Sequence, residues 1–149
     1  MELKELYQEI ILDHGKNPRN KGKCEGYTNE AKAHNPLCGD KVHIYLKLNN
    51  EKKIEDLSFE GEGCAISLAS ASILTDTLKG RDFNVAKAIT DNFLNLIKEN
   101  KLITVNSLND IQKTTLMSLS GVKDFPMRVK CATMAWHTLS TVLENKNEN

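Results

Sequence analysis

The stretch that decides the fold, KVHIYLKLNNEKKIEDLSF, runs from residue 41 to residue 59. Between residues 41 and 48 every second residue is apolar, which is the period-two pattern of a β-strand that buries one face. The pair Asn49-Asn50 then indicates a turn, and residues 53–59 predict a second strand. The sequence therefore predicts a β-hairpin over this stretch.

The second strand of the hairpin carries an irregularity. Leu57 and Phe59 fall on one face of a strand, but Ile54 is out of phase with them. One extra residue in a strand shifts this phase, so we expect a β-bulge or a late start of the strand. A third strand is expected over residues 27–34, which completes a small antiparallel sheet of about three strands.

Helical patterns surround the predicted sheet. A helix over residues 2–14 has one apolar face and ends at GKNPRNKG. The segment CAISLASASILTDTLKG stops at Gly80 and is rich in small residues, which allow another backbone to approach closely. This succession predicts an α+β fold, a single domain over residues 1–149 with helices packed on one face of the sheet. Further helices are expected over residues 82–100, over residues 110–119 and from Asp124 or Pro126 to about residue 143.

Length, charge and cysteine content exclude several classes of protein. The chain has 149 residues with 20 basic and 20 acidic side chains. No stretch concentrates Lys and Arg without Asp or Glu, which argues against a nucleic-acid-binding surface. The apolar runs are too short for a membrane span and the first residues do not form a signal peptide pattern, so we expect a cytoplasmic protein. Thiols stay reduced in that compartment, so the four cysteines indicate metal binding or thiol chemistry before disulfides.

Three of the cysteines lie at the ends of predicted elements, where ligands from distant parts of a chain can meet. Cys38 belongs to the loop NPLCGD, Cys64 begins a helix after GEG, and Cys131 lies in the first turns of the last helix. Asp40, two residues after Cys38, can turn an oxygen toward the same point. Three sulfur ligands and one oxygen suit tetrahedral zinc or an iron–sulfur cluster.

The residues alone leave two interpretations of this set open. No pair of the cysteines forms a CxxC motif, so they are either metal ligands or small buried apolar side chains, with Asp40 as a turn residue. For Cys24 simple burial is favoured, because no ligand-like neighbour accompanies it. His34 is the one histidine that we keep as a candidate to support a metal ligand. Arg128 and Lys130 flank the last cysteine and are either solvated charges or groups that stabilise an anionic site.

Four ordered motifs resemble a known family. They are DHGKNPRNKG, NPLCGD, FEGEGCAISLASAS and RVKCATMAWHTL, and they extend from Asp13 to Leu139. Together they resemble the zinc-dependent SufU branch of the IscU/NifU N-terminal family of iron–sulfur cluster assembly proteins. The resemblance implies a SufE/IscU-like fold and favours the metal-site interpretation of the cysteines.

The resemblance also distinguishes between branches of the family. In IscU-type scaffolds a histidine precedes the third cysteine and a proline-rich recognition segment lies shortly before it. Here Lys130 takes the place of the histidine, and the segment reads SGVKDFPMR. The span between Cys64 and Cys131 is similar to the longer one of SufU proteins, with residues 101–122 as the natural place of the insertion. One departure is Gly15, which stands where the family usually has an aromatic residue. It leaves the metal ligands unchanged and concerns a surface that the resemblance implies faces a partner.

The resemblance implies that Cys38, Asp40, Cys64 and Cys131 bind one zinc ion per chain. It further implies a cysteine desulfurase, SufS, as the partner, and downstream cluster assembly proteins as receivers of sulfur. In the hypothesis that follows, Cys38 is held as a thiolate until a partner side chain replaces it on the metal. The released Cys38 then accepts persulfide sulfur, which makes the protein a sulfurtransferase that acts as co-catalyst of the desulfurase.

Two other hypotheses remain beside this one. The same three cysteines suit an IscU-type scaffold on which a [2Fe-2S] cluster is assembled, with iron in place of zinc. A purely structural zinc domain is a third possibility, but a carboxylate ligand argues against it, because closed structural sites favour Cys and His.

Overall fold

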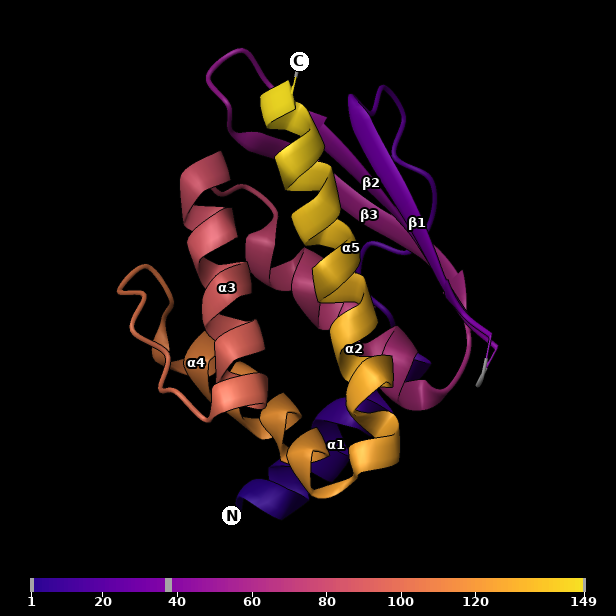
Figure 1. The fold of residues 1–149 in the computed structure, drawn as a ribbon, viewed down its shortest axis with the longest axis vertical. Helices are drawn as coiled ribbons and strands as arrows, with labels where there is room; N and C mark the ends of the chain where they lie inside the picture. Colours follow the sequence, from indigo (N-terminus) through magenta and orange to yellow (C-terminus); the bar gives the residue numbers. More distant parts are fainter. Residues whose placement is uncertain (1, 37–38, 149) are drawn as a thin grey trace.

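The protein has an α+β architecture in which helices cover one face of a three-stranded sheet (Figure 1). The computed structural model describes residues 2–36 and 39–148, with side chains up to residue 144. The predicted fold class is confirmed. The elements are α1 (Leu3–Lys16), β1 (Asn29–Asn35), β2 (Asp40–Leu48), β3 (Ile54–Glu62), α2 (Ala65–Leu78), α3 (Phe83–Glu99), α4 (Asp110–Leu119), the short 3₁₀ turns η1 (Ser120–Asp124) and η2 (Pro126–Arg128), and α5 (Val129–Glu148).

The sheet has the order β1-β2-β3, and both pairs of strands are antiparallel. The hairpin of β2 and β3 contains the expected irregularity: Lys47 lies opposite Asp56, whereas Leu48 lies opposite Ile54. The extra residue, Glu55, forms a bulge. The bulge returns Ile54 to the core, where its side chain is fully buried.

The turn of the hairpin is longer than the sequence pattern suggests. The side-chain oxygen of Asn49 accepts hydrogen bonds from the backbone N–H groups of Glu51 and Lys53, at 2.9 Å and 3.0 Å. An asparagine side chain that binds the backbone two residues on is a common way to build a turn. The third strand, β1, is confirmed but begins two residues later than predicted, at Asn29 rather than residue 27.

The core lies between the sheet and the two helices α2 and α5, which run over its inner face (Figure 1). The helix α2 packs against β3, and α5 packs against β1 and β2. On the far side of α5 lies α3, where the rings of Phe93 and Trp136 have centroids 4.4 Å apart. The alternating pattern of the hairpin is confirmed by its buried apolar residues, Val42, Ile44, Leu46, Leu48, Leu57 and Phe59.

The small residues of α2 let α5 approach it closely, as the sequence predicts. The hydroxyl of Ser70 donates a hydrogen bond to the backbone carbonyl of Ala132 in α5. The same oxygen accepts a hydrogen bond from the indole nitrogen of Trp136, at 3.0 Å. Because all three groups are buried, Ser70 satisfies polar atoms that water does not reach.

Two helix ends differ from the prediction. The first helix continues through Gly15 and ends at Lys16, because a glycine lowers helix stability without breaking the helix and Pro18 is the stronger stop. The last helix starts at Val129 rather than near Asp124, because Pro126 begins a separate 3₁₀ turn in which the Arg128 N–H binds the carbonyl of Phe125 at 2.7 Å. None of the described helices combines the length and apolarity needed to cross a membrane.

We predict that Ser70→Ala lowers the free energy of unfolding by about 1–3 kcal/mol, because it leaves the buried Trp136 N–H without an acceptor. Urea unfolding of the variant measures the change. In a Trp136→Phe background the same substitution should cost clearly less, because the donor is gone. Equal costs in the two backgrounds would contradict this role of Ser70, and Ser107→Ala, at an exposed position, is the control.

Candidate metal centre

Asp40 is the first residue of β2, and its side chain is fully buried. Directly before it, Gly39 has φ +77°, and its N–H donates to the carbonyl of Asn35 at 2.8 Å. One carboxylate oxygen, Oδ1, accepts a hydrogen bond from the backbone N–H of Cys64 at 3.0 Å. This bond ties the start of β2 to the residue that precedes α2.

Cys64 is the N-cap residue of α2, and its sulfur accepts the backbone N–H of Ser67 at 3.4 Å. The sulfur therefore lies at the helix N-terminus, which carries a partial positive charge. The preceding residue, Gly63, has φ +148°, and a Cβ atom there would overlap the carboxylate of Asp40. Both its backbone conformation and the approach of Asp40 therefore require glycine.

Cys131 lies in the first turn of α5, and only 2% of it is exposed. Arg128, at the end of the 3₁₀ turn before this helix, directs its guanidinium group to the same place. Its interactions with the thiols of Cys131 and Cys64 raise the pKa of Arg128 above its usual value. A second helix N-terminus and one arginine thus face the two sulfurs.

The fold brings three of the four predicted ligands together. The candidate ligand atoms of Asp40, Cys64 and Cys131 all lie within 4.8 Å of one another. Within residues 2–36 and 39–148, this is the one group of three or more His, Cys, Asp or Glu side chains with metal-site spacing. The fourth predicted ligand, Cys38, lies outside the described residues, so its place at the site stays a prediction.

The electrostatics of the group make a buried thiol hard to ionise without a cation. Burial and then the neighbouring Asp40 and Cys64 raise the pKa of Cys131 to about 12. A carboxylate and two sulfurs share this place with the positive charge of Arg128. A bound dication would reverse the balance, because it stabilises each thiolate and the carboxylate at once.

One residue near the site was not predicted from the sequence. The hydroxyl of Tyr7 in α1 is buried and has no hydrogen-bond partner in the described part of the chain. Its pKa is raised by burial first and then by Cys64 and Cys131, whereas Arg128 lowers it. The helical pattern indicates only that Tyr7 lies on an apolar face, and no local signal shows that this face meets the cysteines.

The other candidates lie apart from the group. Cys24 is buried, as expected, and its thiol donates to a carboxylate oxygen of Asp56 at 3.4 Å. The described cysteines are free, with no disulfide among them. His34 is exposed on β1 and does not belong to the group of described ligands. Lys130, next to Cys131, is exposed at the start of α5.

The residues present fit a zinc ion. Sulfur from cysteine and oxygen from a carboxylate are both zinc ligands, and the two described sulfurs and one oxygen already converge. Gly63 keeps the space beside the carboxylate open. The third sulfur that a tetrahedral site needs would come from Cys38, two residues before Asp40.

A model of the NifU-like N terminal domain matches residues 6–132 of the chain. The protein belongs to this family. It is similar to the zinc-dependent sulfurtransferase SufU of Bacillus subtilis (strain 168), with 40% identity over 134 residues, which cover 90% of this chain and 86% of that protein. It is also similar to the iron–sulfur cluster assembly scaffold protein IscU of Streptococcus pyogenes serotype M1, with 34% identity over 95% of this chain and 85% of that one.

Solved structures show the same fold. A protein from Fervidobacterium islandicum AW-1, named as an iron–sulfur cluster assembly scaffold for the SUF system, superposes with a TM-score of 0.80 at 33% identity, covering 93% of this chain and 97% of that one. The N-terminal part of a NifU-like protein from Brucella abortus superposes with a TM-score of 0.81 at 21% identity, over 99% of this chain and 98% of that one. The second likeness concerns the fold alone.

We predict that Gly63→Ala weakens zinc binding by roughly tenfold to a hundredfold, because the new methyl group displaces the carboxylate of Asp40. Competition with a chromophoric chelator measures the affinity. The matched control is Gly80→Ala, since Gly80 also has a positive φ, +86°, but a Cβ there meets nothing within 4 Å. Equal zinc affinities of the two variants would contradict a role of Asp40 as a ligand.

We also predict that zinc binding releases protons at pH 7. The pKa of Cys131 is raised to about 12, so the metal-free thiol is protonated, and it must lose its proton to bind zinc. The affinity should therefore rise with pH, by roughly tenfold per pH unit for each thiol that ionises. Calorimetry in two buffers of different ionisation enthalpy counts the protons. Cys131→Ala should release fewer protons and Cys24→Ser as many as the wild type, and unchanged release from Cys131→Ala would refute the assignment.

Proposed function

We propose that the protein is a zinc-dependent sulfurtransferase of iron–sulfur cluster assembly, which accepts sulfur from the persulfide of a cysteine desulfurase. The observation that carries the proposal is the convergence of Asp40, Cys64 and Cys131 within 4.8 Å. The similarity to the SufU sulfurtransferase supports it, since the compared segment covers most of both chains. In this proposal Cys38 completes the ligand set, SufS is the desulfurase, and downstream cluster assembly proteins receive the sulfur.

The chemistry needs a thiolate that is reactive only when a partner is present. When bound, zinc would keep the ligand thiols deprotonated at neutral pH. The thiolate of Cys38 attacks the outer sulfur of the partner's persulfide. A new S–S bond forms as the partner's S–S bond breaks, and the partner's cysteine leaves as a thiolate. The product is a persulfide on Cys38, with no net oxidation or reduction.

Cys38 suits this role better than the other two cysteines because of their backbone positions. Cys64 is fixed at the N-cap of α2, with its sulfur held by the Ser67 N–H. Cys131 lies inside the first turn of α5 and is almost fully buried. The positive charge of Arg128, which interacts with both sulfurs, would offset the negative charge that a persulfide brings.

The same thiols also suit a second function, that of a scaffold on which a cluster is assembled. Cysteine sulfurs also hold [2Fe-2S] clusters, and relatives named as IscU scaffolds match over nearly the same length. In that case the site would hold iron and sulfide, and the product would be a cluster passed to an acceptor protein. The exposed Lys130 before Cys131, in place of the histidine of IscU-type scaffolds, favours the sulfurtransferase.

The experiment is single-turnover sulfur transfer from a cysteine desulfurase, with mapping of the product by mass spectrometry after alkylation. We predict one additional sulfur atom on Cys38 in the wild-type protein. Cys38→Ala should lose both sulfur acceptance and acceleration of the desulfurase, because the attacking thiolate is absent.

The matched control is Cys24→Ser, which removes a thiol outside the proposed site and keeps a donor to Asp56. It should accept sulfur at the wild-type rate. Sulfur found on Cys64 or Cys131, or normal acceptance by Cys38→Ala, would refute the role of Cys38.

A further inference from the structure

The two edge strands of the sheet differ in whether other segments cover their outer edge. Along β3, other segments occupy the outer edge: Phe59 exchanges backbone hydrogen bonds with Asn20 and Gly22, at 3.1 Å and 2.7 Å. Farther along, Ile54 does the same with Gly80 and Arg81, at 2.8 Å and 2.7 Å. A sheet edge covered in this way cannot pair with another chain.

The outer edge of β1 has no such cover. In the described part of the chain, the backbone groups of residues 29–34 form hydrogen bonds with β2 alone. Every second N–H and C=O of an edge strand points away from its neighbour, so this edge presents unused donors and acceptors. A further strand can add here.

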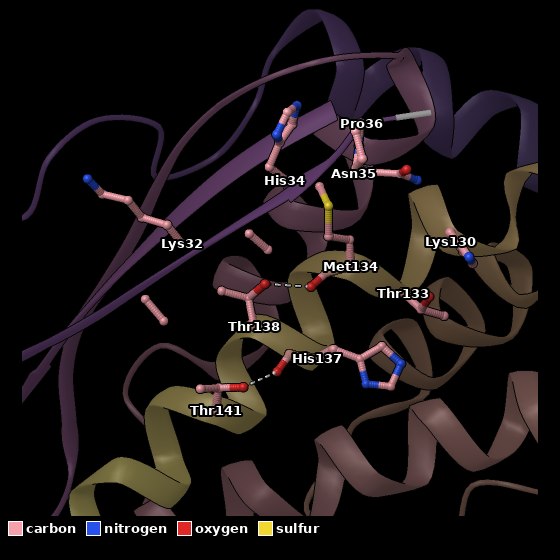
Figure 2. A pocket seen from close by; sticks show the side chains of 12 residues that line it. Lys32, His34, Asn35, Pro36, Lys130, Thr133, Met134, His137, Thr138 and Thr141 are labelled. Carbon is pink, nitrogen blue, oxygen red and sulfur yellow. Dashed lines mark hydrogen bonds between the residues drawn. The ribbon is translucent and has the colours of Figure 1, made fainter. Parts of the chain in front are cut away.

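A groove of about 540 Å³ runs along this edge, between β1 and α5 (Figure 2). Its floor and helix wall are mostly apolar, with Ala31 and Ala33 from the strand and Met134 from the helix. The hydroxyls of Thr138 and Thr141 on the helix already bind carbonyls of their own helix, at 2.7 Å and 3.2 Å. The groove can therefore accommodate an extended segment that lies along the strand and contacts its apolar residues.

The rim of the groove is basic. Lys32 extends from β1 and Lys130 from the start of α5, and both side chains are exposed. Among the described residues that line the groove there is no Asp or Glu, and neither lysine takes part in an ion pair of the described structure. In a chain with equal numbers of acidic and basic residues, this local excess of positive charge selects for a partner with carboxylates.

We propose that the groove between β1 and α5 binds an extended segment of a partner protein, in which acidic and apolar side chains alternate and which adds to the sheet beside β1. Main-chain hydrogen bonds to β1 supply affinity, as in other cases of strand addition. Apolar side chains of the segment contact Ala31, Ala33 and Met134 on the α5 side of β1, and its carboxylates lie on the opposite face, beside Lys32.

The groove ends beside the candidate metal centre. Asn35 and Pro36 line its end, and Pro36 stands two residues before Cys38 in the sequence, as Lys130 stands directly before Cys131. Figure 2 shows Met134 directed toward this end of β1. A segment docked here would hold its protein next to the sulfur chemistry, and this link alone rests on the proposed function.

The test uses the zinc-loaded full-length chain labelled with ¹⁵N and a blocked six-residue peptide of alternating valine and glutamate. We expect saturable shifts of the amide signals of residues 31–34 and 133–138. Lys32→Glu should weaken binding of this peptide by about tenfold, because the attraction between residue 32 and the peptide's glutamates becomes repulsion. The same variant should bind a peptide of alternating valine and lysine instead. The matched control is Lys87→Glu, an equal charge change at an exposed position of α3.

Two N-methylated peptides test the main-chain bonds without altering the protein. One peptide is methylated on the backbone nitrogens of its valines and the other on those of its glutamates, so each lacks the donors of one edge. The peptide that lacks the donors facing β1 should lose binding, and the other should keep it. Equal binding of both peptides, shifts outside the groove, an unchanged affinity of Lys32→Glu, or a dimer that forms through the same residues would overturn the proposal. Because the readout is peptide binding, its failure is distinguishable from a failure of sulfur transfer.

Discussion

The site depends on the hydrogen bond that Asp40 accepts from the backbone N–H of Cys64 at 3.0 Å. It fixes the first residue of β2 against the N-cap of α2, two places that are joined in the chain only through the hairpin. Gly63 makes the approach possible, because any side chain there would overlap the carboxylate. With α2 packed on β3 and against α5, the same bond also sets the place at which Cys131 meets Cys64.

Much of this arrangement could be predicted from local patterns. The alternation from residue 41 to residue 48 identified the hairpin, and the phase of Ile54 identified the bulge, because both are properties of a strand. The approach of Tyr7 to the cysteines could not be predicted, since it depends on how α1 packs against α2. The predicted start of α5 was wrong. A proline suits the first turn of a helix, but here Pro126 begins a separate 3₁₀ turn, and α5 follows it.

The chemistry follows from a conflict of charges. Two sulfurs and a carboxylate that are close together and largely buried repel one another when ionised, and Arg128 with two helix N-termini offsets only part of that repulsion. A bound divalent ion would resolve the conflict, because it stabilises the thiolates and the carboxylate at once. The open edge of β1 ends at Asn35, three residues before Cys38 in the chain, and in our proposal it is the surface that holds a partner beside the site.

The most direct measurement is analysis of zinc, iron and acid-labile sulfide, together with an absorption spectrum, on untagged protein purified without oxygen. We predict about one zinc per chain and no visible colour, because three thiolates and one carboxylate match tetrahedral zinc. Iron with an equal amount of sulfide and a brown absorption spectrum would contradict this prediction, and would identify the site as a place where clusters are assembled.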